Sequence, residues 1–468
     1  AGLQPLGYQP VRGELMQKVG NKPYISVNYT FDGLTPAGLP EDLCYKLNQY
    51  YEQKLRQDKT AHDKIEFEII FNTYDFMTDT RLKELAEYGF DDVEISQLRN
   101  ALFEIAKQTL EHYDEICEED LRSLGQLTEL RHELRKHAPL AETNVMKLYS
   151  YIDELLDSIK DHGTPQFTRQ ARCAFMARSF CRTLVEKGYF TKQEMDDFML
   201  SIPTVASEFE RDFDLYSHGK LSRDDFNHLY GHLRLGTYDI RSDSYRNIYF
   251  DVASANLTGN NKVKQEAKSL DLERLQVALD EAGIPVTPEK FIEFIKKATQ
   301  NREYFKFEFT KSLSLMLDVI VKLGEVMAIA REDMSYLEIQ DLLSYHSRDS
   351  YIQTIETRRR FYHVNSYLVL PEVIFDVGDI DVIDIDEARP NFITNKVVEA
   401  PIVNLDEDHD SDITGKIVAL TKADPGYDWI FAKDIAGFVT KYGGAASHMA
   451  IRCAEFGIPA AIGWGGEK

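Results

Sequence analysis

Apolar residues recur at three- and four-residue intervals over most of the chain, from about residue 81 to about residue 371. This spacing places them on one face of a helix, so we expect a large, mainly helical domain over residues 81–371. The pattern is clearest in four stretches: Leu102–Leu134, Val145–Ile159, Ala171–Glu186 and Leu270–Ala282. No longer fixed period is present, so a solenoid of repeats is not expected.

The first 80 residues have a mixed pattern. Tyr24–Phe31 and Lys64–Phe71 alternate apolar and polar positions, which predicts strands, whereas Pro40–Leu55 predicts a helix. We therefore expect residues 1–80 to form a mixed α/β segment that leads into the helical domain. Glu66 and Glu68 share one face of the second predicted strand, where they either serve a metal or a general base, or simply face water.

The pattern changes again towards the end of the chain. Lys416–Thr421 and Gly437–Thr440 predict strands, and Asp428–Lys433 predicts a short helix between them. This alternation predicts a small α/β domain over residues 403–468, with residues 372–402 as a hinge or linker. The expected fold class is multidomain α+β, a large helical central domain followed by the small α/β domain.

Composition narrows the functional classes. The chain has 468 residues, 43% of them hydrophobic, which is enough for two or three domains with sizeable cores. A formal charge of −24 argues against a general nucleic-acid or membrane surface, because both require basic patches. The run Arg358–Arg360 is either a solvated helix face or a phosphate contact. Five scattered cysteines and the lack of a signal peptide or a long apolar stretch predict a cytoplasmic protein.

One stretch near the C-terminus carries a distinctive layout. The predicted strand at Gly437–Thr440 leads through Gly443 and Gly444 to Ser447, which can cap a helix that begins at His448. Free N–H groups and the positive end of the helix dipole favour an anion at a helix start. A phosphoryl group on the His448 imidazole would therefore be stabilised where it forms.

Arg452 lies four residues after His448, on the same helix face, and predicts a charge-assisted donor to that phosphoryl group. A neutral imidazole is a competent nucleophile near pH 7 and can pass a phosphoryl group on. The alternative is a histidine that merely opens an ordinary strand–turn–helix.

The full string favours the first of these interpretations, because it resembles the phosphohistidine signature of the phosphoenolpyruvate-utilising enzymes. The matching positions are Thr440, Gly443, Gly444, Ser447, His448, Gly457, Pro459 and Gly463. The resemblance implies that His448 is catalytic, that Thr440, the two glycines, Ser447 and Arg452 stabilise its phosphate, and that the small domain swivels between two sites. Arg452-Cys-Ala stands where the family commonly has x-Ala-Arg, and the chain stops short of the family's final strand, so we expect an incomplete C-terminus.

A glycine-bearing stretch between predicted helices gathers further ionisable groups. Gly231-His232-x-Arg234-x-Gly236-x-Tyr-Asp239 resembles a motif in the substrate-binding central domain of the same family. The resemblance makes His232, Arg234 and Asp239 candidates for binding the phosphoryl acceptor. A surface cluster of salt bridges is the alternative.

A second candidate acceptor site opens a long predicted helix. Arg302 and Lys306 have helical spacing and lie near Phe309, so one turn could offer cations to a phosphate beside an aromatic wall. An amphipathic helix with a solvated basic edge is the alternative. No zinc-type ligand spacing is present, and no metal site is expected within this chain.

The order of the parts, a helical domain followed by the histidine domain, resembles rifampin phosphotransferase and the glutamine kinase group of capsule biosynthesis within this family. Both have an N-terminal ATP-grasp domain, so we expect this chain to be the C-terminal part of a longer protein and inactive alone.

The resemblance implies ATP and Mg²⁺ bound mainly by an ATP-grasp domain in cis or in trans. It further implies phosphorylation of His448 with release of AMP and phosphate, then transfer to the side-chain amide of L-glutamine. The alternatives are an antibiotic or pyruvate-type dikinase of the same family, or a non-catalytic phosphocarrier partner of a separate ATP-grasp protein.

Overall fold

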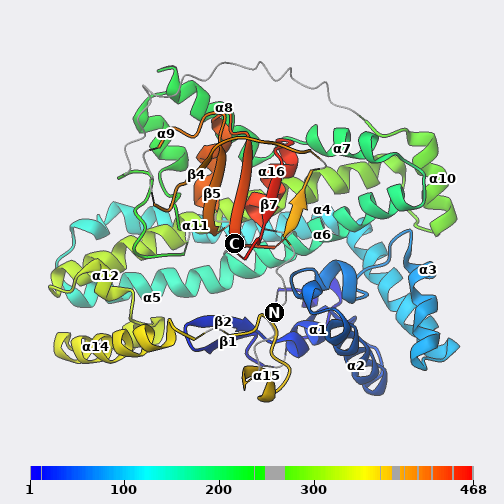
Figure 1. Cartoon of the computed structure of the whole chain (residues 1–468), viewed down its shortest axis with the longest axis horizontal. Coiled ribbons are helices and arrows are strands. Elements are labelled where there is room, and N and C mark those ends of the chain that lie inside the picture. The colour runs from blue at the N-terminus through cyan, green and yellow to red at the C-terminus, as the bar shows by residue number, and fades with distance from the viewer. Residues whose placement is uncertain are drawn as a thin grey trace. The chain divides into compact units, whose positions relative to one another are not determined.

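A computed structural model shows the fold of the chain (Figure 1). It describes residues 2–11, 13–236, 238–247, 269–368, 370–381, 390–394, 396–407, 411–422, 425–444 and 447–465. Part of the predicted hinge, residues 382–389, thus lies outside the described residues. The chain forms two compact units. Unit 1 comprises residues 1–129, 158–204 and 264–309, and unit 2 comprises residues 130–157, 205–263 and 310–468.

Unit 1 begins with a short antiparallel hairpin. Strand β1 (Met16–Val19) pairs with β2 (Lys22–Ile25), and two helices follow, α1 (Val27–Leu34) and α2 (Glu41–Gln57). The prediction of a helix over residues 40–55 is confirmed. The strand predicted over residues 24–31 ends at Ile25, because the Ser26 hydroxyl accepts a hydrogen bond from Tyr29 N and starts α1 there.

The strand predicted over residues 64–71 is wrong. The π-helix η3 (Ile65–Ile69) occupies this region, and the 3₁₀-helix η2 (Lys59–Asp63) directly precedes it. Ile70 N donates to Ile65 O at 3.0 Å, so the backbone is satisfied within the segment and needs no neighbouring strand. The short helices α3 (Thr78–Arg81) and η4 (Leu82–Tyr88) complete the N-terminal part.

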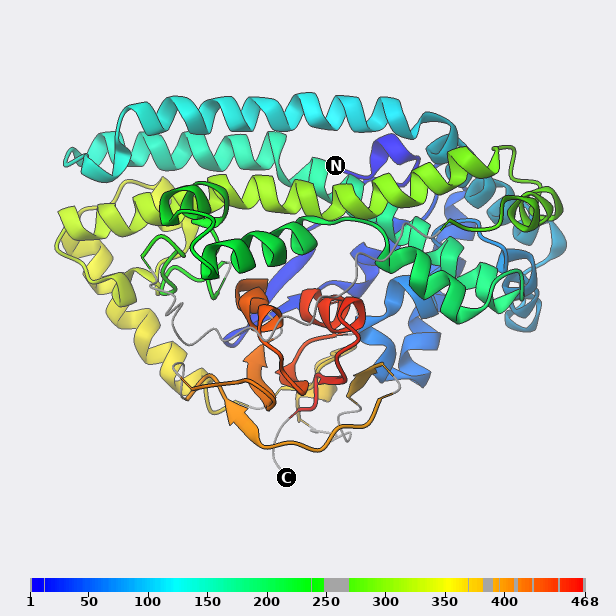
Figure 2. The ribbon, with the colours of Figure 1, turned by 90° about the horizontal axis from the view of Figure 1, so that it is seen from above.

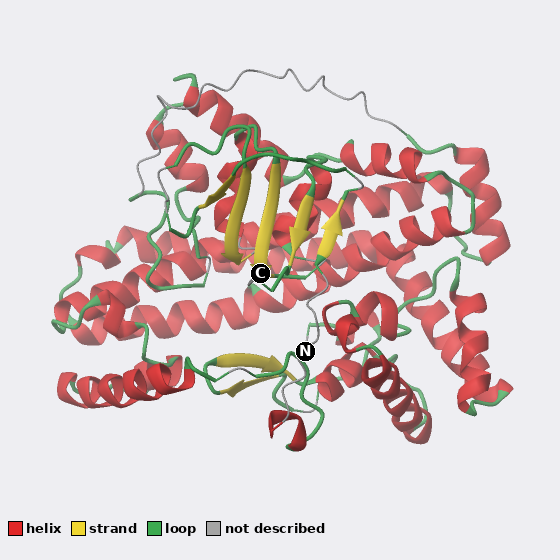
Figure 3. Ribbon diagram, viewed as in Figure 1, coloured by secondary structure: helices red, strands yellow, loops and turns green. Residues whose placement is uncertain are grey.

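The predicted helical periodicity is confirmed in all four stretches, of which Val145–Ile159 belongs mostly to unit 2. Helices make up the rest of unit 1 (Figure 3). They are α6 (Thr164–Glu186), α7 (Lys192–Leu200), α10 (Leu272–Ala282), most of α4 (Asp92–Lys136) and the first part of α11 (Pro288–Val326). Their apolar faces form one core, in which Phe180 packs on Phe291 with ring centroids 5.2 Å apart.

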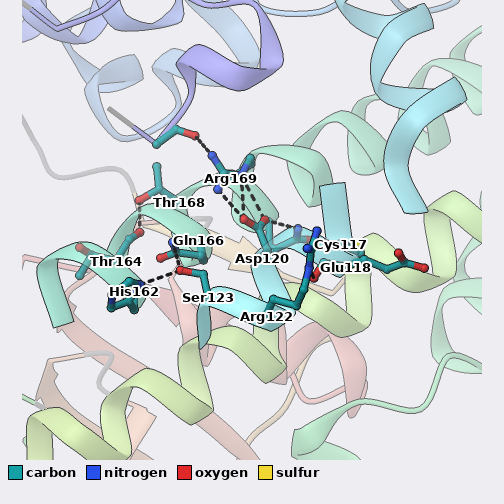
Figure 4. Close-up of polar contacts among 12 residues, drawn as sticks. Cys117, Glu118, Asp120, Arg122, Ser123, His162, Thr164, Gln166, Thr168 and Arg169 are labelled. Carbon is teal, nitrogen blue, oxygen red and sulfur yellow. Dashed lines mark hydrogen bonds and ion pairs between the residues drawn. The ribbon is translucent and has the colours of Figure 1, made fainter. Parts of the chain in front are cut away.

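A buried polar cluster joins α4 to α6 (Figure 4). Arg169 Nε donates to Asp120 Oδ1 at 2.9 Å, and Gln170 Nε2 donates to Asp120 Oδ2 at 2.7 Å. Gln166 reaches the neighbouring Ser123 hydroxyl at 2.8 Å. The charged partners compensate one another, which a buried carboxylate requires.

The helical part of unit 2 contains shorter elements. They are α8 (Val205–Ser217), α9 (Arg223–Tyr230), α12 (Arg331–Met334), α13 (Ile339–Leu343), α14 (Arg348–Asn365), α15 (Gly378–Asp381), and parts of α4, α5 (Val145–His162) and α11. The hydroxyls of Tyr149 on α5 and Tyr351 on α14 lie 2.7 Å apart in its interior. Within the described ranges, no helix is both long and apolar enough to cross a lipid bilayer.

A five-stranded sheet ends the chain, with strand order β3-β7-β6-β5-β4. The strands are β3 (Asn391–Ile393), β4 (Ile402–Asn404), β5 (Ile417–Lys422), β6 (Gly437–Tyr442) and β7 (Ala460–Ile462). All neighbours are parallel except β3 and β7. Strand β3 comes from the segment predicted as the hinge.

Two short helices accompany this sheet. The helix α16 (His448–Glu455) contacts β3 and β7, and Figure 2 shows it beside the sheet in red. The predictions of strands at β5 and β6 and of a helix beginning at His448 are confirmed. The helix predicted over residues 428–433 is instead the 3₁₀-helix η7 (Pro425–Ala432), which begins three residues earlier at a proline.

Candidate functional site

His448 is the first residue of α16, at the end of the connection from β6. The Ser447 hydroxyl accepts from Ala450 N at 3.3 Å, which confirms the predicted cap. Gly443 has φ of +140°, a conformation that a side chain disfavours. Ser447 N donates to Gly444 O at 3.0 Å, and this hydrogen bond links the cap residue of α16 to the second glycine.

Thr440 fixes the strand end of the same connection. Its side chain is fully buried, and its hydroxyl accepts from Gly463 N at 3.2 Å. Its carbonyl accepts from Trp464 N at 2.8 Å. Of the predicted phosphate-stabilising residues, Thr440 therefore lies within β6, Gly443 and Gly444 directly follow this strand, and Ser447 caps the helix that begins at His448.

A carboxylate meets the histidine directly. Nε2 of His448 lies 2.7 Å from Oδ1 of Asp428, which comes from η7. Only 11% of the His448 side chain and 13% of the Asp428 side chain are exposed. A hydrogen bond this short between largely buried groups fixes the orientation of the imidazole ring.

Arg452 approaches the same carboxylate from α16. Its Nε lies 3.4 Å from Asp428 Oδ1, and its guanidinium lies over the rings of Phe456 at 4.5 Å and Phe431 at 5.6 Å. Its Nη2 also donates to Ala206 O at 3.4 Å. The sequence predicted Arg452 as a donor to a phosphate on His448, whereas here Arg452 neighbours the carboxylate that His448 contacts.

Sequence reasoning missed Asp428. The residue is 20 positions before His448, and the sequence placed it in a short predicted helix without a role beside the histidine. The available signal was a carboxylate on the element between the two predicted strands. The sequence does not show how η7 packs against α16, so it could not place this carboxylate beside His448.

The predicted acceptor residues of unit 2 separate into different environments. His232 is buried, and burial together with Lys311 and Arg131 lowers the pKa of its imidazole well below the usual value, so it is neutral at pH 7. Arg234 is also buried, and it donates to Ser314 Oγ at 3.0 Å and to Asp318.

Asp239 pairs with Arg241 rather than with Arg234, at 2.7 Å between Oδ2 and Nη2. Both line a cavity of about 760 Å³, whose wall also includes Lys422 and Tyr427. Tyr427 directly precedes Asp428, the partner of His448. Of the three candidates in this loop, Asp239 therefore lines a cavity, while His232 and Arg234 are among the buried polar groups.

The remaining two candidates belong to unit 1. Arg302 and Lys306 lie in the middle of α11, not at the start of a helix as predicted, and both are half-buried. The Arg302 guanidinium lies 5.3 Å from the ring of Phe175. The sequence predicted Phe309 as the aromatic neighbour of these cations. The neighbour of Arg302 is Phe175 instead, and Phe309 packs on Phe167.

The C-terminal part of the chain has a recognisable counterpart. Residues 413–468 match the model of the PEP-utilising enzyme, mobile domain. The chain is also 27% identical over 222 residues to rifampicin phosphotransferase from Bacillus subtilis (strain 168). Both matches support the phosphoenolpyruvate-utilising enzyme family.

The mobile-domain match includes Asp428, His448 and Arg452, and thus every residue of the contact described above. The similarity to the Bacillus protein covers 43% of this chain, and it spans only 24% of that protein's length. Together the two matches support a phosphotransferase family of the phosphohistidine type.

Proposed function

We propose that the protein transfers a phosphoryl group through a phosphohistidine at His448. The observation that carries the proposal is the position of His448, at the capped start of α16, with a carboxylate 2.7 Å from Nε2, inside the mobile-domain match. The helix start favours the phosphoryl oxygens, and splitting the transfer into two steps lets one nucleophile serve a donor and an acceptor.

Asp428 gives the first step a route for the proton. In the resting geometry Nε2–H of His448 donates to Asp428. For Nε2 to attack phosphorus, the doubly protonated imidazole first passes its Nε2 proton to Asp428 and keeps the proton on Nδ1. The protonated Asp428 side chain moves aside, the N–P bond forms, and the bond from phosphorus to the leaving oxygen breaks. Arg452 remains nearby to offset the negative charge of the phosphoryl group.

ATP is the proposed phosphoryl donor, bound with Mg²⁺ by an ATP-grasp domain in cis or in trans. His448 would take a pyrophosphoryl group with release of AMP, and attack of water on the terminal phosphorus would break the P–O–P bond, release inorganic phosphate and leave phosphohistidine. The swivelling of the mobile domain would carry that group to the acceptor. In this proposal the present chain is inactive without its ATP-grasp partner.

The proposed acceptor is the side-chain amide of L-glutamine, as in the glutamine kinases of capsule biosynthesis. Arg302 and Lys306 are the proposed acceptor contacts, because both are half-buried and the Arg302 guanidinium lies over the Phe175 ring. The roles of His232, Arg234 and Asp239 in acceptor binding stay a prediction. An antibiotic acceptor is the second candidate, favoured by the similarity to rifampicin phosphotransferase.

Phosphorus NMR on the protein together with its ATP-grasp domain, supplied with ATP, Mg²⁺ and L-glutamine, tests this proposal. We expect AMP, phosphate and a phosphorylated-glutamine signal, all absent from His448→Ala. AMP and phosphate without the glutamine signal would retain the His448 chemistry and refute glutamine as the acceptor. AMP formation that persists in His448→Ala would refute the phosphohistidine itself.

A further inference from the structure

Arginines from two helices of unit 1 surround a pair of phenylalanine rings. The Phe67 and Phe175 rings pack edge to face at 5.4 Å. The guanidinium of Arg178 on α6 lies 5.4 Å from the Phe67 ring, and that of Arg302 on α11 lies 5.3 Å from the Phe175 ring. The two cations therefore flank one apolar surface.

Glu66 is the carboxylate of this group. It lies on the π-helix η3, and its side chain is one-third exposed, so solutes can reach it. Its backbone carbonyl accepts from the Asn72 side chain. Short π-helical segments are often found at functional sites, because they redirect one side chain out of the regular pattern.

Arg172 closes the buried side of the group. Its Nε donates to the Tyr8 hydroxyl at 3.1 Å and its Nη2 to Asn72 O at 3.2 Å, which fixes the guanidinium plane. Its Nη1 lies 3.7 Å from Glu66 Oε2, and this buried atom has no hydrogen-bond partner among the residues that the structure describes. A buried donor without a partner points to a ligand or water that completes it.

The charges do not balance within the group. Burial, followed by the nearby Arg302 and Arg182, lowers the pKa of the Arg178 guanidinium. Arg302 has Glu303 at 3.8 Å and Arg182 has Glu186 at 3.5 Å, both long contacts. Crowding like charges costs free energy, which an anion bound at the solvent-exposed Arg178 would offset.

We propose that this arginine cluster, formed by Glu66, Arg172, Arg178 and Arg302 with the Phe67 and Phe175 rings, binds a free amino acid by its α-amino and α-carboxylate groups. Arg178 and Arg302 bind the carboxylate, because guanidinium groups match its two oxygens. Glu66 binds the ammonium group. The inference rests on the proposed function only in assigning the acceptor to this site.

The mixed charge selects among ligands. Inorganic phosphate would use the arginines but would leave Glu66 as a repulsive neighbour, whereas a zwitterion satisfies both signs. A large apolar antibiotic would bury these charges without pairing them. The aliphatic part of an amino acid can lie on the Phe67–Phe175 surface.

Titration calorimetry with L-glutamine, in the His448→Ala background and without ATP, tests the site separately from catalysis. We expect Glu66→Gln, Arg178→Gln and Arg302→Gln each to weaken binding by about tenfold or more, as expected for loss of a charged hydrogen bond. The matched control is Arg274→Gln, an exposed unit 1 arginine that lies over Phe190 at 4.8 Å and pairs with Glu194. Thermal unfolding near that of the parent confirms that each variant is folded.

Ligand analogues assign the two ends. The parent protein should prefer L-glutamine over the analogue without the α-amino group, and Glu66→Gln should lose this preference. The parent should also prefer L-glutamine over its α-carboxyl methyl ester, and Arg302→Gln should lose that preference. Unchanged binding of L-glutamine in all three variants would overturn the proposal. A second overturning result would be that Arg241→Gln, in the cavity of unit 2, loses binding while the three cluster variants keep it. L-glutamine binding at this cluster without phosphoryl transfer to it in the protein with His448 would refute glutamine as the acceptor and leave the binding site intact.

Discussion

Oδ1 of Asp428 lies 2.7 Å from Nε2 of His448 and 3.4 Å from Nε of Arg452, so one carboxylate oxygen links the proposed nucleophile to a buried cation. In the proposed function, the phosphoryl group and this carboxylate would therefore compete for the same nitrogen, and phosphorylation would have to displace a hydrogen bond that is already formed.

Asp428→Asn should slow phosphorylation of His448 by about a hundredfold, because an amide cannot accept the Nε2 proton. The measurement is the rate of phosphohistidine formation in a rapid quench with ATP and the ATP-grasp domain. Asp412→Asn, an exposed carboxylate of the same unit, is the control and should leave the rate unchanged. A rate for Asp428→Asn equal to that of the parent would remove Asp428 from the proton route.

Arg452→Gln should lower the free energy of unfolding by about 3 kcal/mol, because it leaves the largely buried Asp428 without its cation. Arg452→Lys should lose less, since it keeps the charge but not the flat contact with Phe456. Urea unfolding followed by tryptophan fluorescence can measure both, as Trp429 is adjacent to Asp428. Equal stability of Arg452→Gln and the parent would show that the carboxylate does not depend on Arg452.

Arg169→Ala should destabilise unit 1 by about 3–5 kcal/mol, because it leaves the buried Asp120 carboxylate without its partner (Figure 4). Arg122→Ala, on α4 beside Asp120, should change stability by less than about 0.5 kcal/mol, since Arg122 is exposed and its Nε donates to the backbone oxygen of Glu118 at the surface. Urea unfolding at one pH compares the two. Similar losses for both would contradict the assigned role of the Asp120–Arg169 pair.

Glu66→Gln should stabilise the protein without ligand at pH 7. Burial raises the pKa of Glu66 against the opposing pull of Arg172 and Arg302, so the folded state binds this proton more tightly than the unfolded state. The stability contribution of that proton is present below the unfolded pKa and is lost as the pH rises through the folded pKa. The advantage of Glu66→Gln should therefore shrink as the pH falls, and an advantage independent of pH would contradict it.

Regular helices were predictable because their apolar spacing repeats over many turns, as in α4 and α6. The segment at Ile65–Ile69 was not, since its alternation covers too few residues to distinguish a strand from a half-buried π-helical turn. His448 was predictable from its local sequence, because strand, turn, cap and helix are contiguous there.

The partners of the site residues were not predictable, since they are set by packing between distant elements. Asp428 reaches His448 across 20 residues, and Arg234 pairs with Asp318 across 84 residues rather than with the nearby Asp239. Hydrophobic periodicity fixes which face of an element is buried but not its register against a neighbour. For the same reason, the sequence did not predict that Glu66 lies close to Arg172 and Arg302.

The most direct test of the central claim is to label the protein, together with its ATP-grasp domain, using ATP radiolabelled at the β-phosphate. Peptide mapping then locates the label. We predict an acid-labile, base-stable label on the peptide that contains His448, lost in His448→Ala but retained in the control His218→Ala, which replaces an exposed histidine of the same unit. Label on any other residue, or label that persists in His448→Ala, would contradict the account.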